Sequence, residues 1–253
     1  MLGVSQVAGL AGIVVILAIQ GQPFPADANL LWSVAAGGAS IVALGSIYFA
    51  AARGPIIVVA PVAALGAAVP VGLSILRGDQ LSAVAVAGIA AALCGVTIAG
   101  WQTGQGRHVS GGCLGPIMAL VSALAFGVFL ISLDLASRPS PYWATAVMRA
   151  SSCALILGYL AVRRPRVSAL LAVGPLGLLM IAAVGLTDMG AEVSFATASQ
   201  TGELGIIAVL ASLYPAVTVA LAILVLRDRT NWLQISGAVV TTIGAALLAG
   251  AHP

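Results

Sequence analysis

Three ionisable side chains lie inside strongly apolar segments of the sequence. Arg149 lies about two turns into the segment 143–162, Asp188 lies near the middle of 174–199, and Glu192 follows Asp188 by four residues. If these segments are helices in a bilayer, each charge at mid-span costs at least about 2.5–3.5 kcal/mol. Residues four apart share a helix face, so both carboxylates are expected on one side. Charges kept at this cost are the first candidates for chemistry.

A guanidinium and two carboxylates in apolar surroundings support more than one interpretation. In the functional one, they form a central polar site. There Arg149 pairs with Asp188 or Glu192, or binds an anionic group of a solute, and one carboxylate takes up a proton. In the structural one, they form a buried ion pair that only fixes helix packing. Contact with lipid headgroups or water is a third alternative.

Other polar residues lie deep enough in the apolar segments to line the same site, and we keep three of them as candidates for binding or coupling: Tyr48, Ser46 and Ser194. For these, helix packing is the competing interpretation. Tyr142 and Trp143 stand at the start of a segment, where an interfacial aromatic belt is favoured.

The residue types that metal or covalent chemistry needs are scarce and scattered. Cys94, Cys113 and Cys153 are isolated and match neither a disulfide framework nor a metal-site spacing. His108 and His252 lie in or near loops, away from any carboxylate cluster. The sequence has no HExxH, no GxSxG and no basic stripe interleaved with aromatics. We therefore expect no enzymatic activity, no metal, no cofactor and no nucleic-acid partner.

The composition indicates the elements that must position the three charges. Hydrophobic residues make up 61% of the 253 residues and charged residues only 7%, whereas soluble domains carry about 25% charged residues. A surface so poor in charge must face lipid. About 20 apolar helical residues cross a bilayer, and nine segments qualify: 4–20, 31–52, 55–76, 82–100, 114–135, 143–162, 174–199, 204–226 and 232–250.

The second half of the chain repeats the first. Residues 76–100 match 226–250, which aligns three residue pairs: Asp79 with Asp228, Gly88 with Gly237, and Gly95 with Gly244. In each copy the two glycines are seven residues apart and share one helix face, which predicts a tight helix contact there. Upstream, 47–57 resembles 193–207.

These matches predict two repeats, 1–106 with four helices and 107–253 with five. The opening helix 4–20 best matches 147–162, so the first repeat lacks a counterpart of 114–135. A five-helix unit crosses the membrane an odd number of times, so adjacent copies lie in opposite orientations, as in many secondary transporters. We predict an all-α, polytopic transmembrane helix bundle of about nine spans with two inverted repeats.

At this level the chain resembles the EamA-type members of the drug/metabolite transporter superfamily. The resemblance is carried by FAAARGP (49–55) and FATASQTGE (195–203), each followed by a proline-bearing helix, and by the endings LRGD (76–79) and LRDR (226–229). The family often has an arginine in the second helix of each unit. Arg149 fits that position in the second unit, and Gln6 stands at the first-unit equivalent.

The resemblance implies a ten-helix carrier that moves small metabolites without ATP. Nine helices depart from this pattern, so the natural start lies upstream or the first helix has been lost. We expect a secondary membrane transporter of a small metabolite or drug-like solute, working by alternating access between the repeats, with proton coupling as one option. Its partners would be that solute and membrane lipids, in the cytoplasmic (inner) membrane of a bacterium. The alternatives are a channel, a non-transporting scaffold or, less favoured, a membrane-embedded enzyme. Monomer and homodimer both stay open.

Overall fold

The secondary-structure elements that the structure describes are all helices, joined by short turns. The computed structural model describes residues 2–53, 65–76, 78, 82–100, 114–163, 174–202 and 204–211, with scattered positions between 232 and 247. Two short 3-10 helices, η1 (Ala28–Leu30) and η2 (Leu65–Ala67), precede α-helices. The α-helices are α1 (Leu2–Gln20), α2 (Leu31–Arg53), α4 (Ala68–Leu76), α5 (Ala83–Gly100), α6 (Leu114–Ser137), α7 (Pro141–Arg163), α9 (Gly174–Ala198) and α10 (Leu204–Ala211).

Five stretches within these helices are long and apolar enough to cross a membrane: Leu2–Gln20, Ala28–Phe49, Leu120–Ser137, Pro141–Val162 and Gly174–Ala198. They correspond to five of the nine predicted spans. Helix α5 matches a sixth, 82–100, whereas α4 and α10 cover only parts of 55–76 and 204–226. The rest of those two segments lies outside the described residues. The all-helical membrane architecture is therefore confirmed, and the count of about nine spans stays a prediction.

Local capping residues set the ends of the helices around the site. Helix α1 ends at Gly21, whose φ of 61° suits glycine and whose N–H donates to the Leu17 carbonyl at 3.0 Å. The Asp27 carboxylate accepts from the Asn29 N–H at 2.7 Å and caps the short turn that leads into α2. At the start of α7, Pro141 occupies a first-turn position where no N–H is needed.

The chain forms two compact units. The first comprises Met1–Ile41 and Ile131–Thr201, and the second comprises Val42–Leu130 and Gly202–Pro253. The first unit thus holds α1, α7 and α9 entirely, together with the beginning of α2 and the end of α6. Each unit draws on both predicted repeats.

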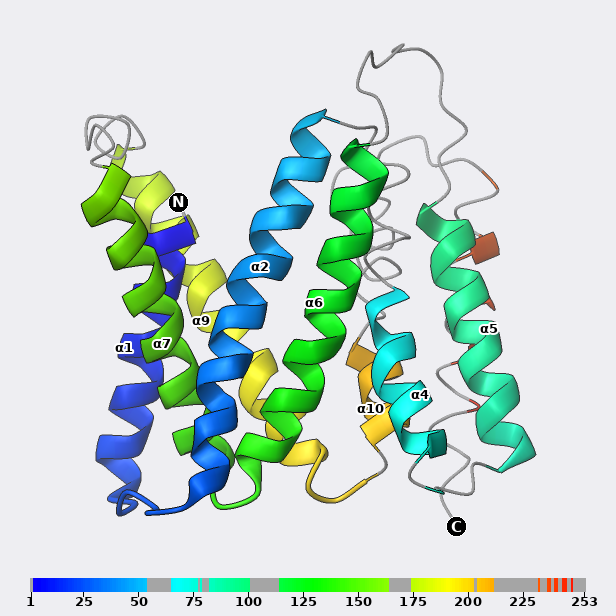
Figure 1. Cartoon of the computed structure of the whole chain (residues 1–253), viewed down its shortest axis with the longest axis horizontal. Coiled ribbons are helices and arrows are strands. Elements are labelled where there is room, and N and C mark those ends of the chain that lie inside the picture. Colours follow the sequence, from blue (N-terminus) through cyan, green and yellow to red (C-terminus); the bar gives the residue numbers. More distant parts are fainter. Residues whose placement is uncertain are drawn as a thin grey trace. The chain divides into compact units, whose positions relative to one another are not determined.

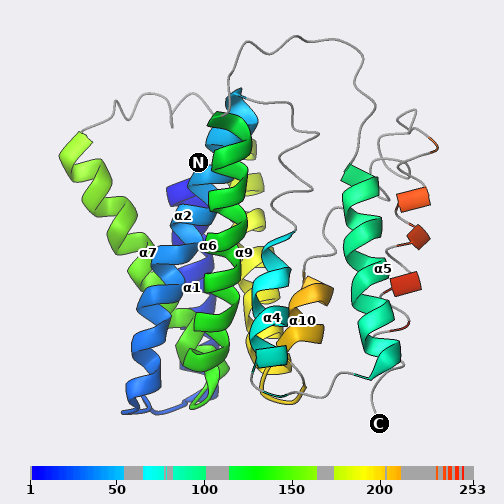
Figure 2. The same cartoon turned by 45° about the vertical axis from the view of Figure 1, so that its right-hand side comes forward.

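In the first unit, α1 packs against both α7 and α9, and α7 contacts α9 (Figures 1 and 2). Their shared core consists of Ile13, Leu17, Ala146 and Met189. Helix α2 joins α7 through small polar residues. There the Ser40 and Ser152 hydroxyls lie 3.2 Å apart, and the Ser152 hydroxyl donates to the Gly37 carbonyl at 3.1 Å. Glycine and serine make these contacts, and such small residues let the backbones approach closely, as is typical of membrane helices.

In the second unit, glycines again mark close helix contacts. A Cβ on Gly66 would lie 2.6 Å from the Ala123 carbonyl oxygen, which places η2 directly against α6. A Cβ on Gly244 would lie 2.5 Å from the Ala92 nitrogen and 2.8 Å from the Gly88 carbonyl oxygen. The tight helix contact predicted for the face that carries these glycines is therefore confirmed for Gly244 and Gly88, which belong to different predicted repeats.

We expect Gly244→Val to destabilise the second unit. The nearest atoms are backbone atoms of α5, which cannot rotate away, so the helices must separate at a cost of about 1–3 kcal/mol. The measurement is the thermal unfolding midpoint of the purified protein in detergent. Gly45→Val is the matched control, because nothing described lies within 4 Å of a Cβ at Gly45. Equal midpoints for the two variants would contradict this contact.

Candidate functional site

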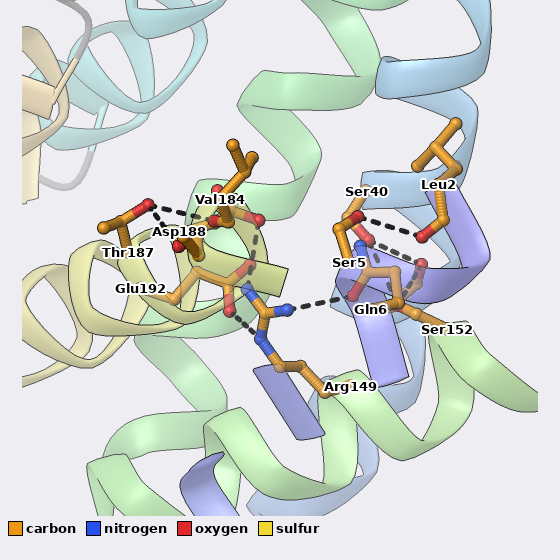
Figure 3. A network of polar contacts seen from close by, with 12 residues as sticks. Leu2, Ser5, Gln6, Ser40, Arg149, Ser152, Val184, Thr187, Asp188 and Glu192 are labelled. Carbon is orange, nitrogen blue, oxygen red and sulfur yellow. Dashed lines mark hydrogen bonds and ion pairs between the residues drawn. The ribbon is translucent and has the colours of Figure 1, made fainter. Parts of the chain in front are cut away.

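Arg149 on α7 is the centre of a buried polar cluster in the first unit. Its side chain is fully buried, at 0% exposed. The Nε group donates to the Glu192 Oε2 atom at 2.6 Å, and Nη2 donates to the Asp188 Oδ2 atom at 3.0 Å. The third nitrogen, Nη1, donates to the Gln6 Oε1 atom at 3.2 Å (Figure 3). One guanidinium therefore joins α7 to α9 and to α1, and all three of its nitrogens have partners. We call Gln6, Arg149, Asp188 and Glu192 the polar cluster.

The two carboxylates of the polar cluster lie one turn apart on α9 but differ in exposure. The Glu192 side chain is 11% exposed, whereas the Asp188 side chain is 52% exposed. The cluster combines one guanidinium with two carboxylates, so it carries a net charge of −1 when all three groups are ionised. Glu192 is thus enclosed with Arg149, and Asp188 forms the open edge of the cluster.

Two glycines let the three helices approach closely enough to form the cluster. A Cβ on Gly9 would lie 2.7 Å from Cζ of Arg149 and 2.8 Å from the Gly185 carbonyl oxygen. A Cβ on Gly185 would lie 2.8 and 2.9 Å from the backbone C and Cα atoms of Ser5. The backbones of α1 and α9 are therefore in direct contact, and the Arg149 guanidinium fills the space beside Gly9.

The other three predicted site residues, Ser46, Tyr48 and Ser194, are not part of the polar cluster that the first unit forms. Ser194 lies two residues after Glu192, which is about 200° around the helix, and it is exposed. Its hydroxyl donates to the Gly190 carbonyl at 2.8 Å. Ser46 and Tyr48 lie on the part of α2 that belongs to the second unit, and Tyr48 is 58% exposed. The polar contacts of Arg149 described above are made by the first unit alone.

Two groups of buried polar residues were missed as site candidates. Gln6 was noted only as the counterpart of Arg149, although it hydrogen bonds to that residue. Asp134 on α6 is 7% exposed, and the Gln200 side-chain amide donates to its carbonyl oxygen at 3.2 Å and to the Ser137 hydroxyl at 2.6 Å. An acidic residue near the end of the apolar run 114–135 was a visible signal for it.

Among the described residues, no group of three or more His, Cys, Asp or Glu side chains could hold a metal ion. That the protein needs no metal or cofactor stays a prediction. The polar cluster offers ion pairing, hydrogen bonding and proton exchange. Its described side chains include no hydroxyl or thiol nucleophile aligned with a base.

Comparison with known proteins finds a family and solved structures that this chain resembles. The family model of the EamA-like transporter family matches residues 114–250, more than half of the chain. No curated protein matches, whereas 24 solved chains do. One of these, described only as "Crystal structure of protein", has a TM-score of 0.77 and 19% sequence identity, and the match covers 97% of this chain and 84% of that one. At that identity, the likeness shows the fold alone.

The fold and the family model define an integral membrane protein of transporter type. The chain belongs to the EamA-like transporter family. This family consists of membrane transporters of small solutes and is not a family of enzymes, which fits the absence of a predicted catalytic motif.

Proposed function

We propose that this protein is a secondary transporter that moves a small metabolite or drug-like solute by alternating access, with the polar cluster as its central site. The observation that carries the proposal is the fully buried guanidinium of Arg149, paired with two carboxylates of α9 inside a bundle of membrane-spanning helices. Such a cluster is expensive in a bilayer, and ionisable residues of this kind mark solute and proton pathways. We place the protein in the cytoplasmic membrane of a bacterium.

Many transporters achieve alternating access with two related halves, and the contacts of the first unit support the two predicted repeats, 1–106 and 107–253. The predicted alignment pairs Gln6 with Arg149, and therefore Ser5 with Met148. A Cβ on Gly37 of α2 would lie 2.6 Å from the Met148 carbonyl oxygen on α7. A Cβ on Gly185 of α9 would likewise meet the Ser5 carbonyl oxygen on α1. Ser5 and Met148, which are equivalent in the predicted alignment, therefore each have a glycine packed against their carbonyl oxygen.

The directions of the helices also fit an inverted repeat. Gly3 faces Ile156 and Gly9 faces Arg149, so residue numbers rise along α1 as they fall along the facing side of α7. These two helices, predicted to be equivalent, run antiparallel. Repeats related by an axis in the membrane plane require this relation. The hydrogen bond between Arg149 and Gln6 then joins the same position in the two repeats.

Within the cluster, we assign proton exchange to Asp188. Three groups surround Asp188. Arg149 from α7 hydrogen bonds to Asp188 and to Glu192, which lies one turn further along α9, and Gln6 from α1 hydrogen bonds to Arg149. Glu192 is enclosed and bound to Arg149 through the shortest contact of the cluster, whereas half of the Asp188 side chain is open. Protonation of Asp188 would bring the net charge of the cluster from −1 to 0 without breaking the Arg149–Glu192 pair.

We expect Asp188→Asn to abolish the dependence of transport on a proton gradient. The amide keeps the shape of the carboxylate but cannot take up a proton. The measurement is solute uptake into proteoliposomes without a proton gradient and with a gradient imposed in each direction, using a solute selected by a thermal-shift screen. One of the two gradients should stimulate uptake by the unmodified protein, and neither should change the residual uptake of the variant.

Thr187→Val is the matched control for this experiment. Thr187 is the exposed neighbour of Asp188, and among the described residues its hydroxyl bonds only to the Ala183 and Val184 carbonyls of its own helix. It should retain stimulation by the gradient. If Asp188→Asn responds to the gradient as the unmodified protein does, Asp188 is not the coupling group.

A further inference from the structure

The substrate class of this site follows from which of its charges is accessible. Arg149 is enclosed by the polar cluster, and three of its five N–H groups, one on each nitrogen, donate to the side chains of Glu192, Gln6 and Asp188. Its side chain is also 0% exposed. Binding of a solute anion at Arg149, one of the alternatives raised by the sequence, would require the anion to reach a guanidinium that is enclosed by its partners. Displacing the nearly buried Glu192 would leave an uncompensated buried charge, which is strongly unfavourable.

Asp188 is the charged group of the cluster that a solute can reach. Its Oδ2 atom accepts from Arg149, and its Oδ1 atom accepts no hydrogen bond from the described residues. The side chain is 52% exposed although it lies near the middle of α9. Because a carboxylate facing hydrocarbon at this depth is costly, the open side of Asp188 should adjoin a space that admits water or solute.

The chemistry around this open carboxylate favours an organic cation. The cluster has one guanidinium for two carboxylates, so one negative charge is left to attract a cation. Val184 and Ala191 lie one turn before and after Asp188, and both are exposed. A metal ion such as Ca²⁺ needs six or more oxygen ligands, which these apolar neighbours do not supply. An ammonium group with an apolar body matches both the charge and the surroundings.

We propose that the transported solute carries a protonated amine, whose ammonium binds Asp188 and whose apolar part packs on α9 beside Val184 and Ala191. This inference rests on the proposed transport function. It excludes solutes whose only charge is negative, such as simple carboxylates and phosphorylated compounds, because the single accessible charge of the cluster would repel them.

The test compares three probes of similar size on the purified full-length protein: hexylamine, 1-hexanol and hexanoate. We expect hexylamine to raise the thermal unfolding midpoint in a saturable manner, and the alcohol and the carboxylate to lack this effect. Asp188→Asn should weaken hexylamine binding about tenfold or more, which corresponds to the loss of one hydrogen bond to a charged group. Thr187→Val should bind it as the unmodified protein does.

Three results would overturn the amine assignment: saturable stabilisation by hexanoate, no stabilisation by hexylamine, or unchanged hexylamine binding in Asp188→Asn. These failures are distinguishable from failure of the transport proposal. If proteoliposomes exchange a neutral or anionic solute found by screening, the transport proposal is supported and the assignment of amines as substrates is wrong. If they exchange none of the solutes that the protein binds, the transport proposal itself fails.

Discussion

Replacing Arg149 with methionine is expected to abolish solute exchange and to destabilise the protein by about 3 kcal/mol. Methionine keeps much of the length of arginine but removes the charge, so the nearly enclosed Glu192 carboxylate loses its partner. Asp188 contributes less to this loss, because half of it is exposed. The measurements are thermal unfolding in detergent and counterflow in proteoliposomes. Arg149→Lys should restore only part of either property, since an ammonium cannot make three directed contacts with the geometry of a guanidinium.

A triple variant separates the functional interpretation of the cluster from the structural one. Arg149→Met combined with Asp188→Asn and Glu192→Gln removes all three charges, so no carboxylate is left uncompensated. We expect its unfolding midpoint to recover towards that of the unmodified protein, while exchange stays absent. Exchange at the normal rate in this variant would show that the ion pairs only fix helix packing.

Replacing Gly185 with alanine is expected to have the second largest effect. The new methyl group would meet the carbonyl oxygen of Ser5 and lie 2.8 Å from its backbone C atom. Backbone cannot rotate out of the way, so α1 must move away from α9, at a cost of up to about 3 kcal/mol. This movement carries Gln6 and Gly9 away from Arg149. We therefore expect a lower unfolding midpoint and a large loss of exchange, measured on the same preparations.

Gly190→Ala on the same helix is the matched control for Gly185→Ala. Nothing described lies within 4 Å of a Cβ at Gly190, so the added methyl group should be tolerated and even favour the helix slightly. If both alanine variants keep normal stability and exchange, close contact between α1 and α9 is not required for the site.

Much of the described fold could be predicted because bilayer physics leaves few options. A run of about 20 apolar residues in a membrane must be helical, since helices satisfy every backbone polar group internally. The predicted segments 114–135 and 174–199 accordingly correspond to the helices α6 (Leu114–Ser137) and α9 (Gly174–Ala198). The shared face of Asp188 and Glu192 followed from their spacing of four residues. The predicted pairing of Arg149 with one carboxylate or the other proved to be pairing with both.

Long-range packing could not be predicted in the same way. The hydrogen bond from Arg149 to Gln6 joins positions far apart in sequence, and it depends on α1 lying within backbone contact of α9. The exposure of the two carboxylates could not be predicted either, because no local sequence pattern shows that Glu192 is enclosed while Asp188 is open. The position of Ser194, in contrast, could have been predicted. Two residues along a helix turn a side chain about 200°, away from the face that carries Glu192.

Counterflow in proteoliposomes tests the central claim most directly. The unmodified protein is loaded with the solute that most raises its unfolding midpoint, and entry of labelled solute is followed. The proposed function predicts saturable, trans-stimulated exchange that Arg149→Met abolishes and Thr187→Val preserves. Exchange that is insensitive to the loss of Arg149, or entry of label without trans-stimulation as expected of a channel, would contradict it.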